Sequence, residues 1–292
     1  MTGKALVLGG GGAVGFGWQI GLLTGLTEAG IDVAGADLVI GTSAGSVVGA
    51  CLSSGTEFTA AIDAVDRLSS ALTAKQLAEG FQVLLGAMAE AGFESDPAAA
   101  LRKIGDLAAA KETPPDEATF LSLIDSLKGT AWPERFRATA IDVTTGELRV
   151  WGPGDGIELR HGIASSCAAP VVFPPVTIQG RRYMDGGVFS HLNTAAATGA
   201  DKILALACFP LTEAPKGMER GFASTMRIVS DEIDSVRATG AAIEAIEPSM
   251  DVFALLGGTG NMLDPRLTEP AREIGHRQAR EVLDRVSALW QD

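Results

Sequence analysis

The stretch Leu6-Val-Leu-Gly-Gly-Gly-Gly-Ala-Val-Gly-Phe-Gly17 runs from an apolar segment directly into four consecutive glycines. The segment from Lys4 to Gly9 has an apolar run without alternation, which is typical of a strand buried on both faces of a parallel sheet. A helix is predicted to follow from about Gly15 to Ala29, with Gly30 at its C-terminal cap. Because glycine costs conformational entropy, the cluster indicates backbone that must come very close to another group.

The same order of elements then repeats. Residues 37–41 (DLVIG) predict a second buried strand, and residues 43–52 predict a second helix. Strand-helix-strand-helix with short connections predicts an α/β fold whose parallel sheet is covered on both faces. Glycines recur at four-residue spacing in both strand-helix units, and we expect such strips to pack closely on the sheet: Gly17, Gly21 and Gly25, and Gly41, Gly45 and Gly49.

The rest of the chain adds helices and further strands. Residues 56–130 show helical periodicity and predict a helical insertion, which is either a cap over a pocket or a plain helical layer. The remaining predictions are strands over 135–151 with a hairpin turn at 144–147, a helix over 159–168, a buried strand over 202–209, and surface helices over 220–247 and 268–290. Since no linker or internal repeat is visible, residues 1–292 are expected to form a single domain.

Composition and charge favour a globular protein and argue against nucleic-acid binding and a membrane span. The chain is 46% hydrophobic and 20% charged, which predicts a sizeable core. A net charge of −13 argues against nucleic acid and against electrostatic docking on anionic lipid. The three cysteines are far apart, and the uncharged windows 5–27 and 38–56 contain too many glycines for a membrane span. A reduced, cytoplasmic protein is therefore expected, with no targeting segment visible.

The glycine-rich loop formally matches a nucleotide-binding pattern. Residues 10–15 (GGGAVG) satisfy G-x-G-x-x-G, but the dinucleotide version requires an acidic residue at the end of the second strand. That strand ends instead in Gly41-Thr-Ser43. The phosphate-loop version requires Lys-Ser/Thr after its last glycine, where this chain has Phe16-Gly17. Nucleotide binding remains an alternative, but in both versions the sequence lacks the second group that would bind the nucleotide.

Residues 41–45 (GTSAG) are a more specific signal. G-x-S-x-G between a predicted strand and a predicted helix is the context of a nucleophile elbow, in which Ser43 projects from a tight turn. Gly41 and Gly45 have no β-carbons, which would otherwise collide with the backbone of this tight turn. Parallel strands end at one edge of the sheet, so the amides of residues 10–12 are expected to meet the Ser43 hydroxyl as an oxyanion hole.

The serine also requires a base. His161, His191 and His276 are the only histidines, and each is more readily explained as a structural or solvated residue. The other candidate is Asp185 in Tyr183-Met-Asp-Gly-Gly187, expected on exposed, bendable backbone in an apolar neighbourhood that would desolvate the carboxylate and raise its basicity.

Three blocks together resemble the patatin-like phospholipase family: LVLGGGGAVG at 6–15, GTSAG at 41–45, and ASSCAAPVVFPPV with YMDGG at 164–187. The resemblance implies a three-layer α/β/α fold with a central, mainly parallel sheet, and a Ser43–Asp185 dyad without histidine. It also implies an oxyanion hole from Gly10, Gly11 and Gly12. The glycines that support these motifs are Gly15, Gly41, Gly45, Gly186 and Gly187.

One position departs from the family pattern, because Val14 stands where the family usually carries Arg or Lys. The expected activity is therefore a general carboxylesterase or acyl-lipid hydrolase acting on lipid or small esters through an acyl-enzyme. No metal or other cofactor is expected, since histidines and cysteines show no ligand spacing. A binding or interaction protein with weak catalysis is the alternative on the same fold. Peripheral membrane contact and oligomeric state stay open.

Overall fold

The computed structural model describes residues 3–59, 62, 65, 67, 72–91, 96–111, 113, 115–127, 129–216, 219–257 and 261–290. Parts of the predicted insertion at 56–130, including 60–61, 68–71 and 92–95, lie outside the described residues.

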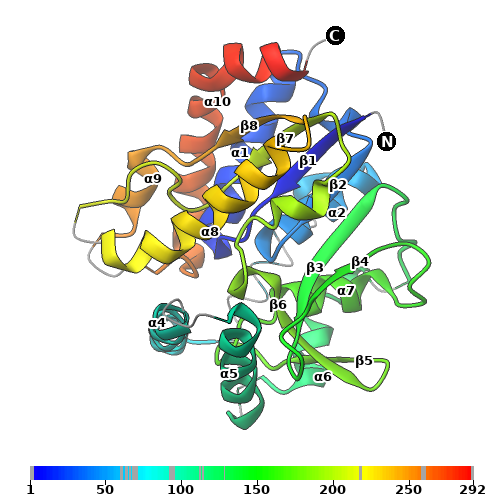
Figure 1. Cartoon of the computed structure of the whole chain (residues 1–292), viewed down its shortest axis with the longest axis vertical. Coiled ribbons are helices and arrows are strands. Elements are labelled where there is room, and N and C mark those ends of the chain that lie inside the picture. Colours follow the sequence, from blue (N-terminus) through cyan, green and yellow to red (C-terminus); the bar gives the residue numbers. More distant parts are fainter. Residues whose placement is uncertain are drawn as a thin grey trace.

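A mixed sheet runs through the molecule (Figure 1). Its strands are β1 (Lys4–Leu8), β2 (Leu38–Gly41), β3 (Phe136–Asp142), β4 (Leu148–Trp151), β5 (Val176–Ile178), β6 (Arg181–Asp185), β7 (Lys202–Leu206) and β8 (Ala242–Ile246). Among the described residues, eight strands pair in the order β5-β6-β3-β2-β1-β7-β8, with β4 on β3 outside this path. The five neighbours β3, β2, β1, β7 and β8 are parallel, whereas β4 and β6 run antiparallel to β3. The predicted α/β class is confirmed.

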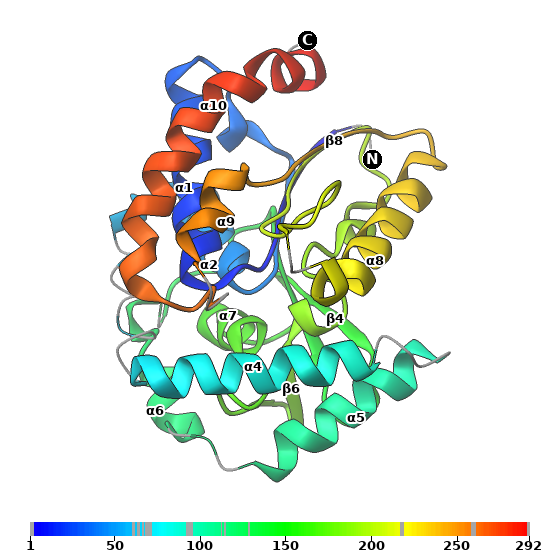
Figure 2. The ribbon, with the colours of Figure 1, turned by 90° about the vertical axis from the view of Figure 1, so that its left-hand side faces the viewer.

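Helices cover both faces of this sheet. They are α1 (Gly12–Glu28), α2 (Ala44–Ser54), α4 (Ala74–Ala91), α5 (Pro97–Ala110), α6 (Glu117–Ser122), α7 (Leu159–Cys167), α8 (Glu219–Arg237), α9 (Met250–Leu255) and α10 (Thr268–Trp290). Figure 2 shows α1 and α10 on one side of the sheet and α8 on the other, with α4 and α5 beside β6. This is the expected three-layer arrangement, and no described helix combines the length and apolar content needed to cross a membrane.

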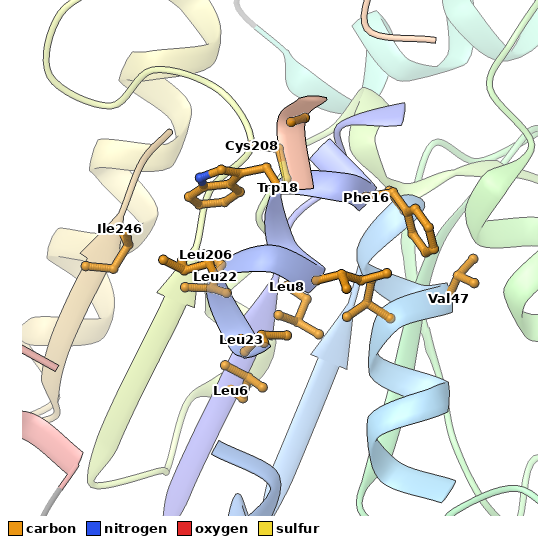
Figure 3. Packing of buried hydrophobic residues seen from close by; sticks show 14 of the residues in the cluster. Leu6, Leu8, Phe16, Trp18, Leu22, Leu23, Val47, Leu206, Cys208 and Ile246 are labelled. Carbon is orange, nitrogen blue, oxygen red and sulfur yellow. The ribbon is translucent and has the colours of Figure 1, made fainter. Parts of the chain in front are cut away.

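Strand β1 shows why both faces are covered. Leu6 and Leu8 pack into the cluster of α1, α2 and α10 (Figure 3). Ala5 and Val7 belong to the cluster that contains α8. All four side chains are fully buried. Side chains alternate along a strand, so where helices cover both faces of the sheet successive side chains are buried on one face and then the other. Burial of each leucine stabilises the fold by about 1.5–3 kcal/mol.

The two glycine strips have different partners. A β-carbon at Gly21 would lie 2.0 Å from the Arg272 carbonyl oxygen, so the strip on α1 packs against α10. The prediction that this strip packs on the sheet is therefore wrong. On α2, a β-carbon at Gly49 would lie 2.9 Å from Phe136 of β3, so the second strip does pack on the sheet.

Two element boundaries also differ from prediction. The first helix begins at Gly12 rather than near Gly15, because its first turn includes the glycine-rich loop itself. The predicted helix over 220–247 ends at Arg237, and residues 242–246 form β8 instead. Strand β8 lies at the sheet edge and pairs with β7 alone, so its partly exposed side chains lack the apolar pattern of a buried strand.

Candidate active site

Ser43 occupies a strained turn between β2 and α2. Its backbone has φ 51° and ψ −121°, a left-handed conformation that side chains rarely adopt. A β-carbon at Gly45 would lie 2.1 Å from the Leu8 carbonyl oxygen, and one at Gly41 would lie 2.4 Å from Ser46 Cα. Both glycines are therefore required by close approach, and Ser43 is the N-cap residue at the positive end of α2.

Neighbouring hydroxyl groups hold this turn. The Ser43 N–H donates to Ser166 Oγ at 2.9 Å, and Ser46 Oγ donates to the Ser43 carbonyl at 2.7 Å. Ser166 belongs to α7, which comes from the third block of the sequence. The turn's backbone is thus bonded on both sides of Cα, which fixes the direction of the Ser43 side chain.

Asp185 is the last residue of β6 and faces the same region. Its N–H donates to the Ala168 carbonyl at 3.0 Å, and its Oδ1 accepts from the Gly187 N–H at 2.7 Å. The expectation of exposed backbone is wrong, because β6 pairs with β3 and Asp185 is 6% exposed. Burial raises the pKa of Asp185 to about 7, although the Gly187 N–H and the polar side chain of Ser43 oppose the rise.

The glycine-rich loop lies against the serine. A β-carbon at Gly10 would lie 3.1 Å from Ser43 Cβ, and the N–H of Gly10 donates to the His191 carbonyl at 2.6 Å. Gly12 has φ +57°, which turns the chain into α1. Among the residues that the structure describes, the N–H groups of Gly11 and Gly12 have no hydrogen-bonding partner. These two amides remain available to an anion.

One cavity collects these groups. It has a volume of about 90 Å³ and is lined by Gly10, Gly11, Gly12, Ser43 and Asp185. Helix α4 contributes apolar side chains to the same lining: Phe81, Leu84 and Met88. The structure thus brings the predicted loop, serine and carboxylate to one place under part of the predicted insertion.

Asn193 is a residue that the sequence did not single out. Its side-chain amide donates to Thr42 Oγ1 at 3.0 Å, to the Gly186 carbonyl at 3.3 Å and to the Ser190 carbonyl at 2.6 Å. Thr42 precedes the serine and Gly186 follows the aspartate, so one buried amide connects the two turns. Asparagine with φ 55° is a common left-handed residue, and no spacing pattern marks it in the sequence.

The histidines occupy three different environments. His276 pairs with Glu28 at 2.8 Å on the outside of α1 and α10. His161 lies on α7, where burial lowers its pKa. His191 is buried at the rim of the candidate site, and burial lowers its pKa to about 3. Within the described ranges, no three metal-binding side chains gather into a group.

The strained serine follows a strand of the mixed sheet and lies in one cavity with a buried carboxylate and the glycine-rich loop, within an α/β fold. The chain belongs to the patatin-like phospholipase family, whose model matches residues 6–198. The family is described as one of patatin-like phospholipases, which supports lipid acyl hydrolysis as the activity at the level of the family.

Solved structures similar to this chain include two larger proteins. VipD from Legionella pneumophila has 14% identity and a TM-score of 0.48, over 98% of this chain and 67% of VipD. The type III effector protein ExoU has 18% identity and a TM-score of 0.43, over 96% of this chain. The chain spans 53% of the length of ExoU. No curated protein matches the sequence.

Proposed function

We propose that the protein hydrolyses carboxylic esters of lipids or small alcohols through a Ser43–Asp185 dyad. The observation that carries this proposal is the buried Asp185 carboxylate, which lines the same cavity as Ser43 and the glycine-rich loop. A base with a pKa of about 7 is half ionised at neutral pH, which suits proton transfer in both directions.

In the first half-reaction, Ser43 Oγ attacks the ester carbonyl carbon while its proton passes to Asp185. The negative charge that forms on the carbonyl oxygen is bound by the Gly11 and Gly12 amides, which lack partners in the described structure. The Gly10 N–H already donates to the His191 carbonyl, so in this proposal it does not bind the oxyanion. Gly10 is needed because a side chain at this position would crowd Ser43. Collapse breaks the ester bond, and the leaving alkoxide takes the proton from Asp185.

In the second half-reaction, Asp185 takes a proton from water as the water oxygen attacks the acyl-enzyme carbonyl. The same amides bind the oxyanion, and its collapse returns the proton to Ser43 Oγ and releases the carboxylic acid. In this proposal the base is Asp185 rather than a histidine, since burial lowers the pKa of His191 to about 3 and the Asp185 carboxylate lines the same cavity as Ser43.

In this proposal helix α4 caps the cavity that contains Ser43. Phe81, Leu84 and Met88 form an apolar roof over the cavity, which would exclude water and contact an acyl chain. Exclusion of water strengthens the hydrogen bonds to the oxyanion. A single domain over residues 1–292, with 56–130 as its insertion, is part of the same proposal.

A fluorophosphonate probe tests the dyad. Wild-type protein should be labelled, Ser43→Ala should not, and Asp185→Asn should be labelled at least about 100-fold more slowly. Ser249→Ala, at the N-cap of α9 and remote from this cavity, is the matched control and should react like wild type. Labelling that survives in Ser43→Ala would assign the nucleophile elsewhere. Absence of labelling and of ester hydrolysis in wild type would favour the binding-protein alternative.

A further inference from the structure

A second, larger cavity adjoins the candidate site between α5 and α8. Its volume is about 420 Å³. Helix α5 gives it an apolar wall with Leu101 and Ile104, whereas α8 gives it a polar wall with hydroxyl groups such as Ser224 and Ser235. The residues that it shares with the 90 Å³ cavity are Met88, Gly187, Val188, His191 and Thr225. A molecule that reacts at Ser43 could therefore extend into it.

His191 stands at the junction of these two cavities with unused hydrogen-bonding capacity. The side chain is 3% exposed, and neither ring nitrogen has a partner among the residues that the structure describes. Its nearest aromatic neighbour, Phe209, contacts the ring edge-on at a centroid distance of 4.9 Å and supplies no acceptor. A buried imidazole without partners is costly. A ligand hydroxyl would satisfy it, because a neutral imidazole offers one donor and one acceptor.

The charges around the larger cavity favour an uncharged ligand. Arg227 is the only lysine or arginine among its described lining residues, and it pairs with Asp231 at 3.8 Å. Glu232 is buried in the same wall and accepts from Ser190 at 2.6 Å. An anionic group would meet two carboxylates and no unpaired cation.

A third cavity, of about 60 Å³, also has Ser43 in its lining and differs in chemistry from the larger one. It is lined mainly by apolar side chains, including Val47, Leu77 and Phe173. An ester held at Ser43 has two arms, one a hydrocarbon chain and the other the alcohol. The apolar cavity suits the first arm, and the amphipathic cavity with its unpartnered imidazole suits the second.

We propose that the cavity between α5 and α8 binds the alcohol part of the ester, and that this alcohol is uncharged and carries a free hydroxyl group, as glycerol does, bound by His191. This inference rests on the proposed hydrolase function and adds the class of its substrate. Esters of phosphate-bearing alcohols are correspondingly poor substrates.

Three octanoate esters that differ only in the alcohol test this inference. The wild-type kcat/KM should be highest for the 1-glyceryl ester, lower for the ethyl ester and lowest for the glycerol phosphate ester. His191→Phe keeps the ring contact with Phe209 but has no nitrogen, so the glyceryl-to-ethyl ratio of kcat/KM should fall about 10-fold. His191→Gln, which keeps a donor and an acceptor, should recover part of the ratio. His276→Phe, on the outer surface, is the matched control and should keep the wild-type ratio.

The outcomes separate this inference from the proposed function. Ser43-dependent hydrolysis with equal rates for glyceryl and ethyl esters, or an unchanged ratio in His191→Phe, would overturn the alcohol site and leave the hydrolase intact. A preference for the phosphate-bearing ester would overturn the assignment of an uncharged alcohol. Hydrolysis of none of the three esters, or hydrolysis that persists in Ser43→Ala, would contradict the proposed function and this inference with it.

Discussion

The side-chain amide of Asn193 donates to the hydroxyl oxygen of Thr42 across 3.0 Å, next to the residue that we propose as the nucleophile. The same amide donates to the carbonyl of Gly186, next to the proposed base. Thr42 is bonded in turn to Thr139 of β3 at 2.8 Å. The distance between nucleophile and base is therefore set by a buried network that neither residue belongs to.

Replacement of Asn193 by glycine tests this network. Glycine tolerates the φ of 55°, so the change removes the amide without adding backbone strain. Loss of the shared donor leaves buried acceptors without a partner, and the free energy of unfolding should fall by about 1–3 kcal/mol. Ester hydrolysis should fall about 10-fold, because the turns at Thr42 and Gly186 are no longer held at a fixed distance from each other. Urea denaturation and kcat measure the two effects, and the exposed Thr198→Ala is a control on the same segment.

Backbone strain at Ser43 predicts a difference between two inactive variants. Ser43→Ala keeps a β-carbon at φ 51°, whereas Ser43→Gly relieves that conformation. Both should lose ester hydrolysis, but the glycine variant should be more stable than the alanine variant by about 1–3 kcal/mol. Thermal unfolding of the pair measures this difference. Equal melting temperatures would mean that the turn is not strained in solution.

The pH dependence of hydrolysis should report the base. Asp185 must be ionised to accept the Ser43 proton, and its pKa is about 7. We expect kcat/KM for an uncharged ester to be half-maximal near pH 7 and to fall about 10-fold per pH unit below it. A profile that is flat between pH 5 and 8 would exclude Asp185 as the titrating base.

The raised pKa of Asp185 also predicts that the stability of the folded protein depends on pH. The folded-state pKa of about 7 lies above the ordinary aspartate value of 3.8, so the folded protein binds the proton more tightly than the unfolded chain does. This contribution to stability is full below about pH 4 and is lost as the pH rises through 7. Asp185→Asn cannot titrate, so its melting temperature relative to wild type should increase from pH 4 to pH 8.

Much of the fold was readable from local pattern. Apolar runs predicted β1, β2 and β7, glycine marked the turns that follow the first two strands, and the G-x-S-x-G context located Ser43. Strands β5, β6 and β8 were missed, because short or edge strands are stabilised by a pairing partner rather than by their own composition. For β6 this mattered most, since it carries Asp185 out of solvent.

Residue types and their order were sufficient to place the chain in its family and to nominate the glycine-rich loop, Ser43 and Asp185 as candidates. They could not say that the Gly10 amide is already bonded to His191, that Asn193 joins the two turns, or that the imidazole of His191 has no partner. Burial and hydrogen bonding depend on groups brought together from remote parts of the chain. Those properties exist only once the sheet and its two helical layers have assembled.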